Sequence, residues 1–287
     1  MAIRARLRSG RWTQVFPGVY ATFTGELGRE PAMWAALLRG WPTAILSHYS
    51  AAEVDGLTDR PVEAIHITVP ESRRIPRTPG VVIHRSDRIY TACHPSRIPP
   101  RTRIEETTLD LAECAKTLDD AVSWLARACG QRLTTAERLT QAMNARKKMR
   151  RRANLANALA DIGDGAHSLL EYRYVRYVER PHGLPAATRQ APVIIGGQRR
   201  YLDNLYKPYG VGTEVDGKAA HPIEERWRDI HRDNHAAEAG IEILRYSAAD
   251  VTERPCQIAA QVGAVLRQRG WKSTLRRCGP ACTLPVP

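Results

Sequence analysis

The hydrophobic pattern between residues 168 and 270 changes type in a fixed order, and this order restricts the fold more than any other feature of the chain. It predicts one helix, three strands, a helix, a strand and a closing helix. The expected helices are 168–183, 221–240 and 255–270, and the expected strands are 189–195, 199–208, 210–217 and 241–247. Pro181 and Gly183 should end the first helix. Such an order favours an α/β sandwich with a mixed sheet.

The part of the chain before residue 165 predicts shorter elements. A basic helix over residues 3–8 precedes a hairpin over 11–22 that turns at Pro17 and Gly18. Further helices are expected over 29–41, 47–56, 105–115, 118–129 and 134–145, and strands over 64–70 and 81–87. Ser47 is the expected N-cap of the 47–56 helix, and Thr134 or Thr135 that of the last helix.

The chain is strongly basic, with a formal net charge of +13 over 287 residues. This charge favours an anionic partner, of which nucleic acid is the commonest. Only six of the 43 basic residues are lysine, a bias that a GC-rich genome also produces. We predict nucleic-acid contacts in three places: Arg4, Arg6 and Arg8 in the first helix; Arg146, Lys147 and Lys148 in the run "RKKMRRR"; and Arg228 and Arg232 in the 221–240 helix. A solvated surface or linker explains such a run equally well.

No targeting segment or membrane span is expected, because no stretch approaches the ~20 apolar residues that cross a bilayer. The sequence thus predicts a soluble, cytoplasmic protein. Its six cysteines are scattered, and only Cys278 and Cys282 lie close together. Two ligands are a weak zinc signal, because a structural site needs four; free thiols are the preferred interpretation. His48, His66 and His84 are also far apart in sequence, and we predict three separate core or surface histidines.

Three carboxylates lie in a stretch that otherwise reads as two strands, where acids are uncommon: Asp203, Glu214 and Asp216. Side chains alternate across a strand, so Glu214 and Asp216 should share a face. If the two strands form a hairpin, Asp203 approaches that face from the neighbouring strand. Three uncompensated carboxylates would repel one another, and a divalent cation such as Mg²⁺ or Mn²⁺ relieves the repulsion. The alternative is that these acids bind no metal and lie on a solvated face of the sheet.

The spacing D-x₁₀-E-x-D after a helix that carries Glu171 resembles the restriction-endonuclease-like superfamily. The run "YLDNLY…VGTEVDGKAAH…RDIHRDN…GIEILRY" is similar to an uncharacterised bacterial family related to very-short-patch-repair endonucleases, over about residues 165–270. The resemblance implies a metal site at Asp203 and Glu214 and a DNA substrate. Asp216 stands where the superfamily has lysine, so Lys218 or His221 would assist the attacking water. Glu171 also lies three residues after Ser168, and a capping box explains it equally well.

The first 110 residues resemble the antitoxin-type regulators of type IV (abortive-infection) toxin–antitoxin systems, through "GRWTQVFPGVYAT", "LSHYSAAEVDGL" and "IHITVP". The resemblance implies a DNA-binding regulator, and leaves a toxin partner unproved. The basic helix and hairpin resemble the last helix and wing of a winged helix-turn-helix that lacks its earlier helices. The predicted segments are winged-helix-like (1–25), regulator-like (26–110), helical with a basic linker (111–164), restriction-endonuclease-like (165–270) and a Cys-containing tail (271–287).

These patterns together predict a metal-dependent DNA endonuclease positioned by a regulator-like N-terminal module. Two alternatives remain open. The first is a non-enzymatic DNA-binding antitoxin or repressor that keeps the nuclease fold as a scaffold. The second is a toxin or phage-defence nuclease that acts on RNA. The acids at 203 and 214 favour an enzyme, whereas the missing superfamily lysine favours a scaffold.

Overall fold

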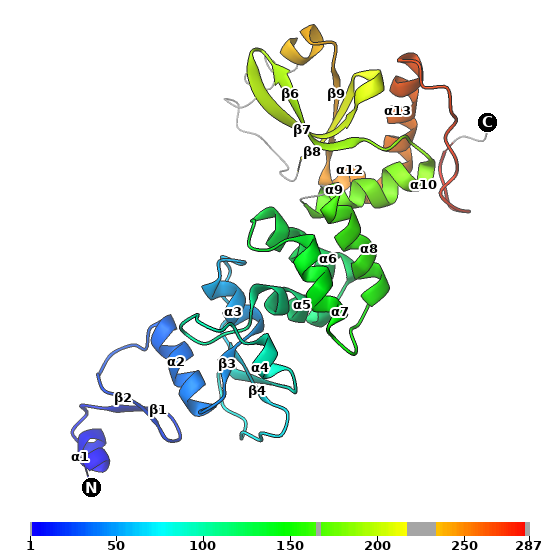
Figure 1. Ribbon diagram of the computed structural model, residues 1–287. Coiled ribbons are helices and arrows are strands. Elements are labelled where there is room, and N and C mark those ends of the chain that lie inside the picture. Colours follow the sequence, from blue (N-terminus) through cyan, green and yellow to red (C-terminus); the bar gives the residue numbers. More distant parts are fainter. Residues whose placement is uncertain (1, 165–167, 217–233, 285–287) are drawn as a thin grey trace. The chain divides into compact units, whose positions relative to one another are not determined.

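The structure is a computed structural model that describes residues 2–164, 168–216 and 234–284 (Figure 1). The chain divides into two compact units, Met1–Leu155 and Ala156–Pro287, which are described separately. Both units mix helices with β-sheet. No helix in the described ranges is long and apolar enough to cross a membrane.

The first unit begins with a helix and a hairpin, as predicted. Helix α1 (Ala2–Arg8) is followed by the antiparallel strands β1 (Thr13–Phe16) and β2 (Val19–Ala21). Gly18 occupies the turn with a φ of +82°, a conformation that glycine adopts without steric penalty. The helix and hairpin are therefore confirmed as local elements.

A three-stranded mixed sheet forms the centre of the next segment. Strands β3 (Ile45–Leu46) and β4 (Ile65–Pro70) run antiparallel, and β4 pairs in parallel with β5 (Val81–Ser86). Helix α2 (Arg29–Arg39) packs its apolar face on this sheet, and α3 (His48–Val54) follows β3 directly. Ser47 occupies the N-cap position of α3, as the sequence predicts, but its hydroxyl lies 3.0 Å from His48 Nδ1 and makes no capping hydrogen bond to the helix backbone.

Helices complete the first unit. They are α4 (Ile89–Ala92), α5 (Ile104–Cys114), α6 (Leu118–Gly130) and α7 (Ala136–Asn144), and α8 (Arg152–Gly163) continues into the second unit. Thr117 caps α6 with a full capping box, and Thr135 caps α7 through a hydrogen bond to the Arg138 amide. The three helices predicted between residues 105 and 145 are confirmed.

The second unit starts with one long helical run. It comprises α9 (Leu169–Arg173), a π-helical segment η1 (Tyr174–Glu179) and α10 (Arg180–His182). The run ends at His182, between Pro181 and Gly183, as the sequence predicts. Gly183 ends the helix with a φ of +70°.

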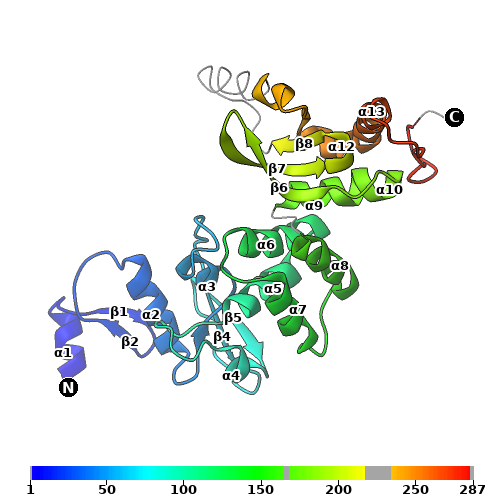
Figure 2. The same ribbon diagram turned by 45° about the horizontal axis from the view of Figure 1, so that its top comes forward.

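A four-stranded mixed sheet follows, with the order β6-β7-β8-β9 (Figures 1 and 2). Strands β6 (Thr188–Ile195), β7 (Gln198–Tyr206) and β8 (Val211–Asp216) form an antiparallel meander, with a 3-10 turn, η2 (Lys207–Tyr209), before β8. Strand β9 (Glu242–Ser247) pairs in parallel with β8. The predicted mixed sheet is confirmed.

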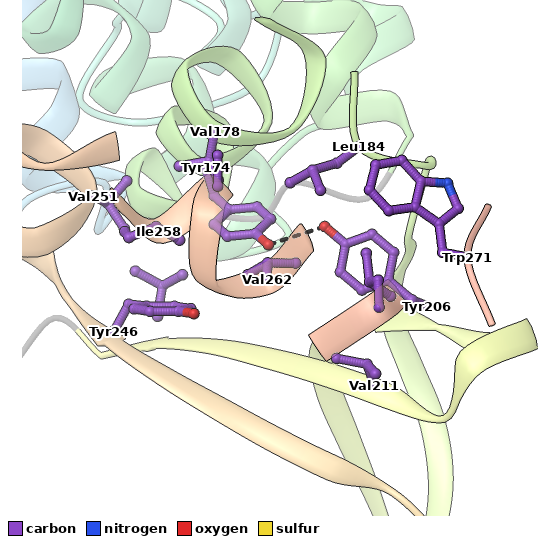
Figure 3. Packing of buried hydrophobic residues seen from close by; sticks show 13 residues of the cluster. Tyr174, Val178, Leu184, Tyr206, Val211, Tyr246, Val251, Ile258, Val262 and Trp271 are labelled. Carbon is purple, nitrogen blue, oxygen red and sulfur yellow. Dashed lines mark hydrogen bonds between the residues drawn. The ribbon is translucent and has the colours of Figure 1, made fainter. Parts of the chain in front are cut away.

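Two helices close the second unit, α12 (Ala248–Glu253) and α13 (Pro255–Gln268). Helix α12 is not predicted by the hydrophobic pattern; it begins with a capping box at Ser247 and Asp250. Apolar residues of the long helical run and of α13 pack on one face of the sheet, around a hydrogen bond of 3.0 Å between the hydroxyls of Tyr174 and Tyr206 (Figure 3). This core holds the strands that carry the predicted carboxylates.

Candidate active site

Asp203 and Glu214 lie on adjacent antiparallel strands. The ladder between β7 and β8 runs from Tyr206–Val211 to Asn204–Thr213, and Asp203 and Glu214 are the next residues beyond its last pair. Asp216 follows two positions later on β8, where its backbone pairs with Ser247 of β9. The predicted hairpin thus exists, and it places two of the three acids on neighbouring strands.

The carboxylate of Asp203 is held by two N–H donors. The side-chain amide of Gln190 on β6 donates to Oδ1 at 3.1 Å, and the backbone amide of Val215 on β8 donates to Oδ2 at 2.9 Å. Gln190 has a φ of +43°, which is uncommon for a residue with a side chain. These contacts from both neighbouring strands fix the orientation of the carboxylate and leave further lone pairs on its oxygens.

Glu214 has a cationic neighbour on β9. The parallel register pairs Glu214 with Arg245, and the Arg245 Nε lies 3.4 Å from a Glu214 oxygen. Both side chains are largely shielded from solvent. Arg245 therefore supplies part of the positive charge that the sequence analysis attributed to a divalent cation alone.

A buried polar network lies behind these acids, on the positions that alternate with them. The Asn204 amide donates to Thr213 Oγ1 at 3.0 Å, and the guanidinium of Arg189 bonds both Asn204 and Glu179. Tyr206 extends the network to the same glutamate at 3.4 Å. Burial raises the pKa of Tyr206, so its hydroxyl stays protonated. The network locks β6, β7 and β8 in register and so positions the acids.

Sequence reasoning missed this network, although a signal for it exists. Asn204 and Thr213 alternate with Asp203 and Glu214, so they had to point into the core if the acids did not. A buried amide and hydroxyl need hydrogen-bond partners, which predicts further polar side chains on the facing helix.

Glu171 lies in the first turn of α9. Ser168 caps this helix by accepting a hydrogen bond of 3.1 Å from the Glu171 amide, as the capping interpretation requires. Glu171 is also buried, with only 6% of its surface exposed. A capping role alone does not require this burial, because capping residues function equally well on a solvated helix end. A role of Glu171 in catalysis remains a prediction.

The other predicted site residues have different outcomes. Lys218, His221, Arg228 and Arg232 lie outside the described residues. Arg4, Arg6 and Arg8 are exposed on α1, and the guanidinium of Arg6 lies 4.7 Å from the centre of the Trp12 ring. Lys147 and Lys148 are exposed as well.

The position of Arg146 contradicts the predicted nucleic-acid contact of this residue. It was expected to contact nucleic acid, but its side chain is only 1% exposed. Its guanidinium bonds Glu106 at 2.5 Å, Asp110 at 2.7 Å and Glu113 at 3.4 Å. These acids recur along one face of α5, a pattern that could have indicated a buried cationic partner. Arg146 therefore holds the segment after α7 on α5 and is unable to reach a phosphate.

The prediction that His48, His66 and His84 are three separate residues was wrong, because the structure brings them into contact. His66 Nδ1 lies 3.0 Å from His84 Nε2, and the rings of His48 and His84 stack with centroids 3.6 Å apart. Burial, with the neighbouring histidines, lowers the pKa of His48 to about 2 and that of His84 to about 4. The stacked rings are nearly parallel, at 11°, so their in-plane lone pairs are unable to converge on one metal ion. The lowered pKa values keep these rings uncharged at neutral pH.

Comparison with protein-family models gave no match to this chain, and comparison with curated proteins gave none either. Functional inference therefore depends on the residues themselves.

Proposed function

We propose that the second unit is a metal-dependent endonuclease that hydrolyses phosphodiester bonds of DNA. The observation that carries the proposal is the position of Asp203 and Glu214 on the paired strands β7 and β8, next to the Asn204–Thr213 pair, with Asp216 two residues after Glu214 in the chain. Carboxylate oxygens are hard donors of the kind that Mg²⁺ or Mn²⁺ prefers. The net charge of +13 supports a polyanionic substrate.

Asp203 and Glu214 would hold the cation, with Asp216 completing the set of ligands. A bound cation of this kind neutralises charge at the phosphodiester and lowers the pKa of its bound water. The chain's own contribution is positioning: Gln190 and the Val215 amide fix Asp203, and Arg245 fixes Glu214. Lys218 or His221 would assist the attacking water, as the resemblance to repair endonucleases implies.

A second function has its own support. Arg245 partly neutralises Glu214, and Asp216 replaces the superfamily lysine, so the second unit is able to keep its fold without metal or catalysis. The protein would then be a non-enzymatic DNA-binding repressor or antitoxin. In both proposals the exposed arginines of α1 contribute DNA contacts, and a cognate toxin would be a further partner.

The test is a cleavage assay with purified full-length protein. Supercoiled plasmid, linear duplex, mismatched duplex and RNA are incubated with Mg²⁺ or Mn²⁺, after chelation and after re-addition of the metal. Metal-dependent nicking of DNA supports the endonuclease, and cleavage restricted to RNA moves the proposal to an RNA substrate. DNA binding without any cleavage supports the repressor.

Two variants make the assay specific to the site. Glu214→Gln removes one ligand charge and should lower the cleavage rate by about 10²-fold or more, because transition-state electrostatics of this kind have that size. Glu253→Gln, an exposed acid of α12, is the matched control and should cleave normally. Mn²⁺ should raise the melting temperature of wild type by linkage and that of Glu214→Gln much less. Equal Mn²⁺ responses of the two proteins would refute the metal site.

A further inference from the structure

Four metal-ligand side chains from three separate parts of the second unit meet at one point. His182 ends α10, Cys256 lies in the first turn of α13, and Cys278 and Cys282 lie in the segment after α13. Their potential ligand atoms all lie within 4.8 Å of one another. The predicted pair of cysteines thus gains the two further ligands that the sequence alone did not reveal.

Three of the six distances between these atoms match tetrahedral coordination closely, and the other three are below 4.8 Å. Cys256 Sγ lies 3.7 Å from both Cys278 Sγ and Cys282 Sγ, and His182 Nε2 lies 3.8 Å from Cys282 Sγ. Around a tetrahedral zinc ion, the usual bond lengths place two sulfurs about 3.8 Å apart and a sulfur and a nitrogen about 3.6 Å apart. The protein therefore spaces its donors as a zinc ion would.

A hydrogen bond at Nδ1 of His182 orients its other ring nitrogen, Nε2, for metal binding. His182 Nδ1 lies 2.8 Å from the backbone carbonyl of Val178, which is able only to accept a hydrogen bond. Nδ1 must therefore carry the proton, and Nε2, which faces the cysteines, carries the free lone pair. Zinc-binding histidines are commonly oriented in this way by a carbonyl or carboxylate. His182 is fully buried, so its orientation is fixed by packing as well.

The backbone of the tail brings its two cysteines to the same place. Residues 271–278 form neither helix nor strand, yet the Arg276 amide donates to the His182 carbonyl at 3.0 Å. A turn then follows, closed by a hydrogen bond of 3.1 Å from the Cys282 amide to the Gly279 carbonyl. A segment with so little regular structure is held against α10 and α13 chiefly by its side chains, so a metal link here would stabilise it.

We propose that His182, Cys256, Cys278 and Cys282 bind one structural zinc ion that fixes the C-terminal tail to α10 and α13. Three sulfurs and one nitrogen form a soft donor set that selects zinc over Mg²⁺, so this site differs in chemistry from the carboxylate site. Four protein ligands fill the tetrahedron and leave no position for water or substrate. The role is therefore structural, and it is independent of whether the protein is an enzyme.

The test starts with the metal content of the full-length protein, purified under reducing conditions and reconstituted with zinc. The expected result is one zinc per chain by elemental analysis, and reconstitution with Co²⁺ should give the visible absorption bands of tetrahedral thiolate coordination. Cys278→Ser should lose most of the bound zinc and lower the melting temperature. Cys114→Ser changes an exposed cysteine of the first unit and should retain full zinc content.

Three results would overturn the proposal. The first is wild-type protein that binds no zinc or Co²⁺ after reconstitution, a measurement that needs no variant to fold. The second is a Cys278→Ser protein that binds zinc as wild type does. The third is a disulfide between two of these cysteines, found by mass spectrometry, that persists in the protein in place of metal. Failure of the zinc site leaves the nicking result of Glu214→Gln unaffected, so the two proposals are judged separately.

Discussion

Replacing Arg146 by methionine should destabilise the first unit strongly. The substitution keeps much of the side-chain volume but removes the charge that lies between Glu106, Asp110 and Glu113. Removing one partner of a buried ion pair typically costs about 3–5 kcal/mol, because the remaining charge is buried without compensation. Arg88 bonds Glu106 at 2.7 Å and in the variant still compensates part of its charge. The expected loss of unfolding free energy is therefore at the lower end of this range, about 3 kcal/mol. A loss of about 3 kcal/mol in a unit of this size lowers the melting temperature by about 6–12 °C.

The pH dependence provides an independent check of the same reasoning. Burial already raises the pKa of Asp110 to about 6, despite the opposing effect of Arg146. A carboxyl whose pKa is raised on folding stabilises the fold when protonated and loses that contribution as the pH rises. Without Arg146 the pKa of Asp110 should rise further. The difference in stability between wild type and variant should therefore narrow as the pH falls from that higher pKa towards 6, and should stay nearly constant below 6.

The assay is scanning calorimetry, which separates the transitions of the two units, together with DNA-binding measurements. Lys148→Met is the control, since this lysine is exposed and a surface change of this kind stays within about 0.5 kcal/mol. The double variant Arg146→Met with Asp110→Asn should recover part of the lost stability. A loss below about 1 kcal/mol, or weaker DNA binding with an unchanged melting temperature, would refute the buried role of Arg146.

Two further predictions concern the first unit. His48 stays neutral in the folded state, with its pKa lowered to about 2, so only the unfolded state takes up its proton as the pH falls below 6.5. This residue should therefore lower the free energy of unfolding by about 2 kcal/mol at pH 5. His48→Asn should flatten the pH profile of the melting temperature, and asparagine tolerates the φ of +49° at this position. An equally steep profile in the variant would contradict a neutral His48. Replacing Arg4, Arg6 and Arg8 by glutamine should weaken duplex binding and reduce its salt dependence, measured by fluorescence anisotropy at several salt concentrations; unchanged affinity would place the DNA surface elsewhere.

Much of the local structure was predictable, because the periodicity of a helix or a strand depends only on residues close together in the sequence. The pattern around residues 200–216 predicted β7 and β8, and a hairpin between them was enough to place Asp203 and Glu214 on neighbouring strands. Short α12 was missed because six residues give too little periodicity to distinguish a helix from a turn.

Contacts between distant segments were not predictable in the same way. His66 and His84 meet because β4 and β5 pair in parallel, and no local pattern gives that pairing. His182 and Cys256 likewise reach the tail cysteines only through the packing of α10 and α13. Arg146 was misassigned because a run of positive charge was interpreted by composition, whereas its burial depends on the acids of α5.

The parallel pairing of β8 with β9 also bears on the order of folding. The antiparallel strands β6, β7 and β8 are joined by short connections, whereas Val211 of β8 must find Glu242 across a long stretch of chain. Contacts between residues so far apart form late, because a large loop must close before they stabilise anything. During synthesis β8 therefore remains an open edge until β9 has left the ribosome, and Glu214 meets Arg245 only at that point.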